Sequence, residues 1–254
     1  AAAAATAATK AARKSESTSV VVAVRCRPFN ARERKLNTTL AIRMDGPTTA
    51  IRSPKAKNDD DERTFAFDHS FWSHDAASPN FHTQEHVYDS IGRGVLDNAL
   101  QGFNACIFAY GQTGSGKTYS MMGNDEQPGL VPRLCHELFA HVQENSKETL
   151  SYTVEVSYLE IYNEQSFDLL KVGGKSKPLR VRNHKSLGPY VEGLSKFAVK
   201  DYASVLQFME SGNAVRTTAA TKMNDTSSRS HAIFSLVVKQ TVSHPGGKRI
   251  GEKV

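Results

Sequence analysis

An octapeptide near the middle of the 254-residue chain, GQTGSGKT at residues 111–118, combines residue types that bind phosphate. It fits the pattern G-x-x-x-x-G-K-[ST] at every fixed position. Glycines let backbone N–H groups turn inward around phosphate oxygens, and a helix that begins there adds the positive end of its dipole. Lys117 would reach the β and γ phosphates as a point charge, and the Thr118 hydroxyl would coordinate magnesium. The expected phosphate-binding residues are Gly111, Gln112, Thr113, Gly114, Ser115, Gly116, Lys117 and Thr118.

The flanking sequence supplies the setting that this motif requires. Residues 104–110, NACIFAY, read as a short and fully buried strand, and a run compatible with a helix comes after the motif. Upstream, apolar residues recur near helical spacing between 82 and 101, and Gly102 stands where a helix end favours a positive φ. The alternative, a glycine-rich loop that binds nothing, fits this setting less well.

Strand and helix patterns alternate along the rest of the chain. Apolar runs and period-two alternation predict strands at residues 20–29, 65–72, 152–162, 228–240 and, as short pieces, within 179–199. Helical spacing predicts a helix over 130–142, and Asp201 is a plausible N-cap for another. This alternation predicts an α/β fold in which helices cover both faces of a mostly parallel central sheet.

Composition narrows the class of protein without choosing a function. No apolar run approaches the roughly 20 residues that a membrane-spanning helix needs, so we expect no membrane insertion. Cys26, Cys106 and Cys135 lie far apart and lack zinc-binding or disulfide spacing, which favours a reducing cytosol and a buried packing role for each. The net charge of +6 is compatible with nucleic acid, a membrane surface or an acidic protein polymer. The sequence lacks the interleaved aromatic and basic residues of common nucleic-acid modules, so nucleic-acid binding is not expected.

The N-terminal segment differs in composition from the rest of the chain. Residues 1–19 are mainly alanine, serine and threonine and have nothing large to pack, so we expect a disordered extension. Its basic, acid-poor character leaves an organelle-targeting peptide as the alternative. Residues 20–254 are expected to form one domain.

Several segments together resemble the kinesin motor domain. The phosphate loop reads FAYGQTGSGKTYSMMG, and RCRPFN at 25–30, VSYLEIYNE at 156–164 and NDTSSRSH at 224–231 occur in the order and spacing of that family. The segments FDHSFWSHD, CIFAYGQTG, LRVRNHKSLGPYVEGLSKFAV and SGNAVRTTAAT look most like the kinesin-3 class. The resemblance covers nearly everything after residue 19 and implies the P-loop NTPase fold of a kinesin motor domain.

The resemblance also implies a nucleotide and a magnesium ion. ATP would bind with its adenine bordered by Arg25 and Pro28 and covered by the ring of Tyr119, and Arg27 would also belong to the nucleotide-binding residues. A tyrosine that simply packs in the core is the alternative for Tyr119. The phosphate loop would then hold the triphosphate and its Mg²⁺.

NDTSSRSH resembles the switch I loop of kinesins, which senses the third phosphate. Asn224, Ser227 and Ser228 would hold the γ phosphate, the magnesium shell and the attacking water, with Ser228 as a second Mg²⁺ ligand. Arg229 would await an acidic partner on a second switch. Taken without its neighbours, a serine-rich loop is more often simple turn chemistry.

A second switch of the form D-x-x-G should come after the strand predicted at 228–240 and its return hairpin, and the chain ends at Val254 without one. Residues 89–92 match the pattern but precede the phosphate loop inside a predicted helix, so we assign them a structural role. We therefore interpret residues 20–254 as the N-terminal portion of a motor domain that stops before switch II. Such a fragment alone is expected to bind nucleotide poorly and to hydrolyse it slowly or not at all.

The leading hypothesis is an ATP-hydrolysing, microtubule-stimulated motor in the cytoplasm, plus-end-directed by resemblance. Arg182, His184 and Lys185 could face the acidic exterior of tubulin, or could form a merely solvated loop. One alternative is a catalytically silent kinesin-like fragment that binds microtubules or regulates a partner. Another is an unrelated P-loop ATPase. Cargo-binding and dimerisation segments are expected outside this chain.

Overall fold

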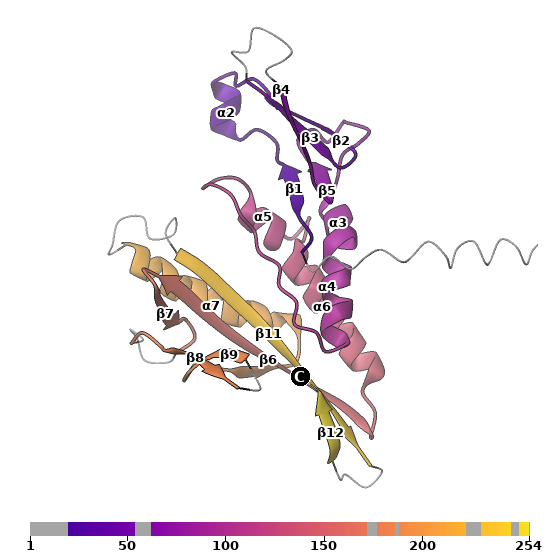
Figure 1. Cartoon of the computed structure of the whole chain (residues 1–254), viewed down its shortest axis with the longest axis vertical. Coiled ribbons are helices and arrows are strands. Elements are labelled where there is room, and N and C mark those ends of the chain that lie inside the picture. Colours follow the sequence, from indigo (N-terminus) through magenta and orange to yellow (C-terminus); the bar gives the residue numbers. More distant parts are fainter. Residues whose placement is uncertain are drawn as a thin grey trace, which may run out of the picture. The chain divides into compact units, whose positions relative to one another are not determined.

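The computed structural model of the chain describes residues 20–53, 62–171, 177–185, 188–221, 230–244 and 249–253. The chain divides into two units, Ala1–Thr83 and Gln84–Val254, whose elements are drawn in Figure 1. The candidate phosphate loop belongs to the second unit. Arg25, Arg27 and Pro28 belong to the first.

The first unit is built from two small sheets and one short helix. Strand β1 (Ala23–Cys26) runs parallel to β5 (His69–Trp72), with Ala23 opposite His69. Strands β2 (Ile42–Asp45), β3 (Thr48–Arg52) and β4 (Glu62–Ala66) form an antiparallel sheet in that order. Helix α2 (Ala31–Lys35) comes directly after β1. Buried apolar side chains such as Met44, Ala50 and Phe71 hold this unit together.

The second unit begins with a continuous helical segment that leads toward the phosphate loop. It consists of α3 (Gln84–Val87), the π-helical turn η2 (Tyr88–Gly92) and α4 (Arg93–Leu100). Gly92 is required in the π turn because a Cβ there would lie 2.3 Å from the ring of Tyr88. Gly102 ends the segment with φ of 90°, a conformation that glycine adopts without strain.

A strongly antiparallel sheet forms the centre of the second unit. The long strand β6 (Leu150–Tyr162) pairs with β10 (Phe197–Val199), with β7 (Gln165–Asp168) and along its whole length with β11 (Ser230–Ser243), which in turn pairs with β12 (Arg249–Lys253). Helices α6 (Leu130–Asn145) and α7 (Tyr202–Thr221) pack with this sheet in one core, which contains Leu138, Val156 and Val205. A separate hairpin joins β8 (Val181–His184) and β9 (Gly188–Val191).

Most of the predicted elements are confirmed. The helix predicted over 82–101 and its terminal Gly102 are present, and residues 89–92 lie in the π turn, where Asp89 accepts a hydrogen bond from Arg93 at 2.7 Å. Asp201 accepts from the backbone N–H of Ser204 at 2.8 Å, so it caps α7 as expected. The run 65–72 is divided between β4 and β5, with a break at residues 67–68.

The prediction of a strand at residues 104–110 is wrong. These residues form neither helix nor strand, and Phe108 and Tyr110 are 80% and 96% exposed. A strand that is apolar on both faces needs neighbours at both edges, and none of the strands among the described residues pairs with this segment. Cys106 is exposed for the same reason, whereas Cys135 is fully buried as predicted and Cys26 is half-buried.

Strand direction also differs from the expectation. Among the strand pairs within the described ranges, β1–β5 is parallel and the others are antiparallel, so the pairing is not mostly parallel. The helices that the described residues form include none long and apolar enough to cross a membrane. The segment 1–19 lies outside the described residues.

Candidate phosphate-binding site

The octapeptide at 111–118 forms an irregular loop that ends in helix α5 (Lys117–Met121). Three of its glycines occupy conformations that other residues adopt with strain. Gly111 has φ of 150°, Gly114 has φ of 78°, and Gly116, the residue that caps α5, has φ of 96°. The backbone therefore turns sharply just before the helix, as the motif predicts for a loop whose N–H groups surround an anion.

The two polar side chains with assigned chemistry stand at the start of α5. Lys117 Nζ donates hydrogen bonds to the carbonyl oxygens of Gly111 at 2.7 Å and Gln112 at 2.9 Å. Its ammonium group therefore lies against the loop rather than away from it. Thr118 is the next residue on the first turn and is exposed. A positive charge and a hydroxyl at the mouth of a glycine-rich loop are suited to phosphate oxygens and a hard cation.

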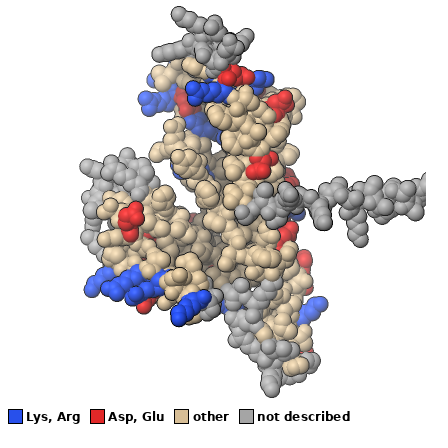
Figure 2. Space-filling view, in the orientation of Figure 1, with Lys and Arg blue, Asp and Glu red and all other residues tan. Residues whose placement is uncertain are grey.

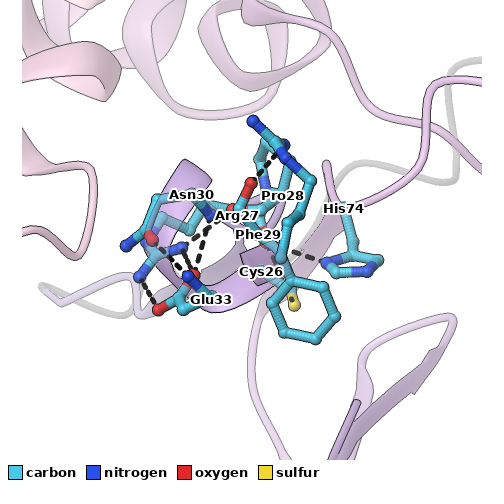
Figure 3. Close-up of polar contacts among 8 residues, drawn as sticks. Cys26, Arg27, Pro28, Phe29, Asn30, Glu33 and His74 are labelled. Carbon is cyan, nitrogen blue, oxygen red and sulfur yellow. Dashed lines mark hydrogen bonds and ion pairs between the residues drawn. The ribbon is translucent and has the colours of Figure 1, made fainter. Parts of the chain in front are cut away.

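Arg25, Arg27 and Pro28, which are expected to contact the nucleotide, lie in the first unit, where Figure 3 shows the residues next to Arg27. Arg25 donates through Nε to Ser73 Oγ at 2.9 Å. Arg27 forms a bidentate ion pair with Glu33, with both N–O distances 2.7 Å, and also donates to the Pro28 carbonyl. Asn30 and Glu33 complete a capping box at the start of α2.

Glu33 is the most strongly perturbed carboxyl of this cluster. Its hydrogen bond with Arg27, helped by the backbone N–H of Asn30, lowers the pKa of Glu33 to about 2. Glu33 therefore stays ionised at neutral pH and holds the Arg27 guanidinium in place (Figure 3). A contribution of Arg27 to nucleotide binding stays a prediction.

An open groove of about 440 Å³ adjoins Pro28 in the same unit. Phe29 and His74 meet there edge to face with ring centroids 4.7 Å apart, and His74 Nδ1 lies 3.0 Å from the Arg27 carbonyl oxygen. The lining residues are Pro28, Phe29, Arg34, Leu40, Trp72, His74, Asp75 and Ser78. Aromatic walls of this kind accept flat, partly apolar rings. The sequence predictions named Pro28 alone from this set; the aromatic residues of RCRPFN and FWSH were the available signal.

Tyr119 and the predicted residues of the segment 224–231 come later in the chain than the residues that line this groove. Tyr119 lies on α5 in the second unit and is 42% exposed, so it is not a core tyrosine. Asn224, Ser227, Ser228 and Arg229 lie outside the described residues, between the end of α7 and the start of β11. Their roles stay predictions.

The residues proposed to face a protein polymer lie on the β8–β9 hairpin. Arg182, His184 and Lys185 are all exposed, and Arg182 forms an ion pair with Glu192 at 3.1 Å. Figure 2 shows lysine and arginine side chains gathered over this hairpin. The hairpin therefore presents basic side chains to solvent, as either sequence interpretation requires.

Curated relatives match most of this chain. Kinesin-like protein Klp98A of Drosophila melanogaster is 50% identical over 229 residues, which cover 88% of this chain and 18% of the relative. Human KIF1C is 52% identical over 225 residues, covering 87% of this chain and 20% of the relative. Human KIF13A is 49% identical over 242 residues, covering 93% and 13%. The chain thus spans a fifth or less of the length of these relatives, which are kinesin-3 members, so the resemblance to that class is confirmed.

Solved structures match over the same extent. A KIF14 motor described as bound to ADP and in complex with a microtubule superposes with a TM-score of 0.83 at 42% identity, covering 92% of this chain and 66% of that one. A second KIF14 structure, with AMP-PNP and a microtubule, gives a TM-score of 0.78 at 43% identity, covering 91% of this chain and 64% of that one. The family model for the kinesin motor domain matches residues 25–252. With the phosphate loop in its expected conformation and that match across nearly all of the described residues, the chain belongs to the kinesin motor domain family.

Proposed function

We propose that this chain is the nucleotide-binding part of an ATP-driven microtubule motor. The observation that carries the proposal is the conformation of residues 111–118, where left-handed glycines lead into α5 and Lys117 lies across the loop. Support comes from related solved structures, since the matched KIF14 motors are described with ADP or AMP-PNP and in complex with a microtubule. The proposed location is the microtubule cytoskeleton of the cytoplasm.

Magnesium would bind at the end of the loop that carries Thr118. Mg²⁺ prefers oxygen ligands and is commonly held by a few protein oxygens together with substrate phosphates. Thr118, an exposed residue that follows Lys117 in the chain, carries a hydroxyl oxygen that fits that preference. Ser228 would add a second hydroxyl. When bound, the ion would neutralise charge on the phosphates; Lys117 and the loop N–H groups would orient them.

The other proposed roles correspond to the parts of a nucleotide. Arg25, Pro28 and Tyr119 would contact the adenine. The aromatic groove beside Pro28 supports the assignment of Pro28. Asn224, Ser227, Ser228 and Arg229 would respond to the third phosphate, so that its release changes the conformation of their loop. This coupling of phosphate to loop conformation is the proposed basis of movement.

The basic hairpin β8–β9 would contribute to microtubule binding. Arg182, His184 and Lys185 are exposed on it and carry the charge that an acidic polymer surface attracts. Because the Arg182–Glu192 pair is exposed, salt would screen it and leave Arg182 able to exchange partners.

Hydrolysis measurements on the full-length protein test the proposal. ATP turnover would be measured with and without microtubules for the wild type, for Lys117→Ala and for the exposed control Lys147→Ala. We expect microtubules to stimulate the wild type and the control, and Lys117→Ala to lose about a hundredfold or more of the stimulated rate. Equal rates for Lys117→Ala and wild type would contradict the assignment of the loop. Nucleotide and microtubule binding without turnover would favour the silent binding module.

A further inference from the structure

Helix α5 is too short to fix its own position. It contains five residues, and its closing hydrogen bonds run from Ser120 N to the Gly116 carbonyl at 2.9 Å and from Met122 N to the Thr118 carbonyl at 2.8 Å. A single helical turn is unstable in isolation, because nucleation fixes several residues for each hydrogen bond gained. The segment before the loop, residues 104–110, is not part of a sheet within the described residues. Other contacts must therefore hold Lys117 and Thr118 in place.

The side chain of Gln84 makes such a contact. Gln84 is the first residue of α3 and is 2% exposed. Its Nε2 donates to the carbonyl oxygen of Tyr119 at 2.7 Å and to that of Gln127 at 3.3 Å. A primary amide has two N–H groups, so one nitrogen can serve both acceptors. Gln84 thereby ties α5 to a turn that lies on the way to α6.

That turn is itself closed tightly against α5. Asn124 N donates to the Gln127 carbonyl at 3.1 Å, and Gly129 N donates to the Met122 carbonyl at 2.9 Å. A Cβ on Gly129 would lie 2.7 Å from backbone atoms of Met121, and a Cβ on Gly123 would lie 2.1 Å from the Gln127 carbonyl oxygen. The backbone therefore touches itself at the end of α5, and Gln84 holds both sides of this junction.

We propose that Gln84 is a positioning residue of the nucleotide site, an inference that rests on the function proposed above. Gln84 contacts the Tyr119 carbonyl, two residues after Lys117 and one after Thr118, so it sets where both side chains stand. A buried amide is unfavourable unless its hydrogen bonds are made, and an apolar residue would satisfy a purely packing role equally well. The amide therefore indicates that the geometry of the junction, and not its burial alone, matters.

Two substitutions separate positioning from packing. Gln84→Met keeps the length of the side chain and removes both donated hydrogen bonds, whereas Gln84→Asn keeps the amide on a shorter stem. Gln143→Met, at an exposed site on α6, is the matched control. Each would be made in the full-length protein. The measurements are the affinity for a fluorescent ADP analogue, the melting temperature, and amide exchange of Ser120 and Met122 without nucleotide.

We expect Gln84→Met to weaken ADP-analogue binding about fivefold to tenfold and Gln84→Asn to weaken it less. Exchange at Ser120 and Met122 should rise in both variants, and the control should match the wild type. A lower melting temperature with unchanged affinity and unchanged exchange would overturn the inference. If Gln84→Met does not fold, the same comparison holds for Gln84→Asn. Failure of the wild type to bind the analogue would refute the proposed function, while the exchange data would still decide the role of Gln84.

Discussion

At the scale of single residues, the cations of the two candidate regions are held by oxygens of the protein itself. Lys117 lies on the carbonyls of Gly111 and Gln112, and Arg27 is paired with Glu33. Restraint of this kind reduces the side-chain freedom that is lost on binding an anion. For Lys117 the restraint points toward the phosphate loop, and for Arg27 it stiffens the start of α2.

The Arg27–Glu33 pair predicts a pH dependence of stability. The folded-state pKa of Glu33 is about 2, below its ordinary value of 4.5, so ionised Glu33 stabilises the fold above about pH 4.5. That contribution disappears as the pH falls toward 2. We expect Glu33→Gln to melt below the wild type at pH 7 and the gap to narrow between pH 5 and pH 3. Thermal melts across this range, with the exposed Glu148→Gln as control, would disprove the prediction if the gap stayed constant.

A candidate site that depends on local sequence could be located from the sequence. The octapeptide could be identified because its glycines and its Gly-Lys-Thr end have fixed spacing, and the structure shows glycines with positive φ within it. Gln84 could not be identified, because its role depends on a carbonyl 35 positions away in the chain. Nothing in the local sequence distinguishes it from an ordinary helix-start glutamine.

At the scale of elements, two polar side-chain contacts join strand β6 to helix α7. Tyr158 and Glu160 lie two residues apart on β6 and so share a face. Tyr158 donates to Asn213 Oδ1 at 2.8 Å, and Glu160, 6% exposed, pairs with Arg216 at 2.9 Å. Arg216 also donates to Ser230 Oγ at 2.9 Å, which ties α7 to the start of β11.

This buried pair predicts a non-additive response to mutation. Arg216→Met would leave Glu160 charged and unpaired, and we expect the free energy of unfolding to fall by about 3 kcal/mol. Adding Glu160→Leu should restore most of that loss, since the buried charge is then gone. Urea denaturation of the wild type, both single variants and the double variant measures the coupling. Additive losses would show that the pair does not act as a unit.

Elements with strong periodicity were predicted correctly, while pairing was not. The apolar spacing of helix α6 and of strands β6 and β11 predicts each element whatever it packs against. Residues 104–110 have the pattern of a buried strand, but whether a strand is buried depends on neighbours that pattern cannot supply. Strand direction likewise depends on the connections, so the prediction of mostly parallel pairing was wrong within the described residues.

At the scale of the whole molecule, the extent of the match establishes the family, whereas the proposed mechanism rests on one loop. Kinesin-3 relatives match nearly nine-tenths or more of the chain at about half identity. The proposed motor function depends on the claim that residues 111–118 bind the phosphates of a nucleotide. If that binding is the main source of affinity, then the number of phosphates on the ligand must control binding.

Competition among adenine nucleotides tests this claim most directly. A fluorescent ADP analogue would be bound to the full-length protein with Mg²⁺ and displaced by ATP, ADP or AMP. We predict that ATP and ADP displace it at concentrations at least about a hundredfold below AMP, because AMP lacks the phosphates that Lys117 and the loop would hold. Displacement by AMP as effective as that by ADP would contradict the account.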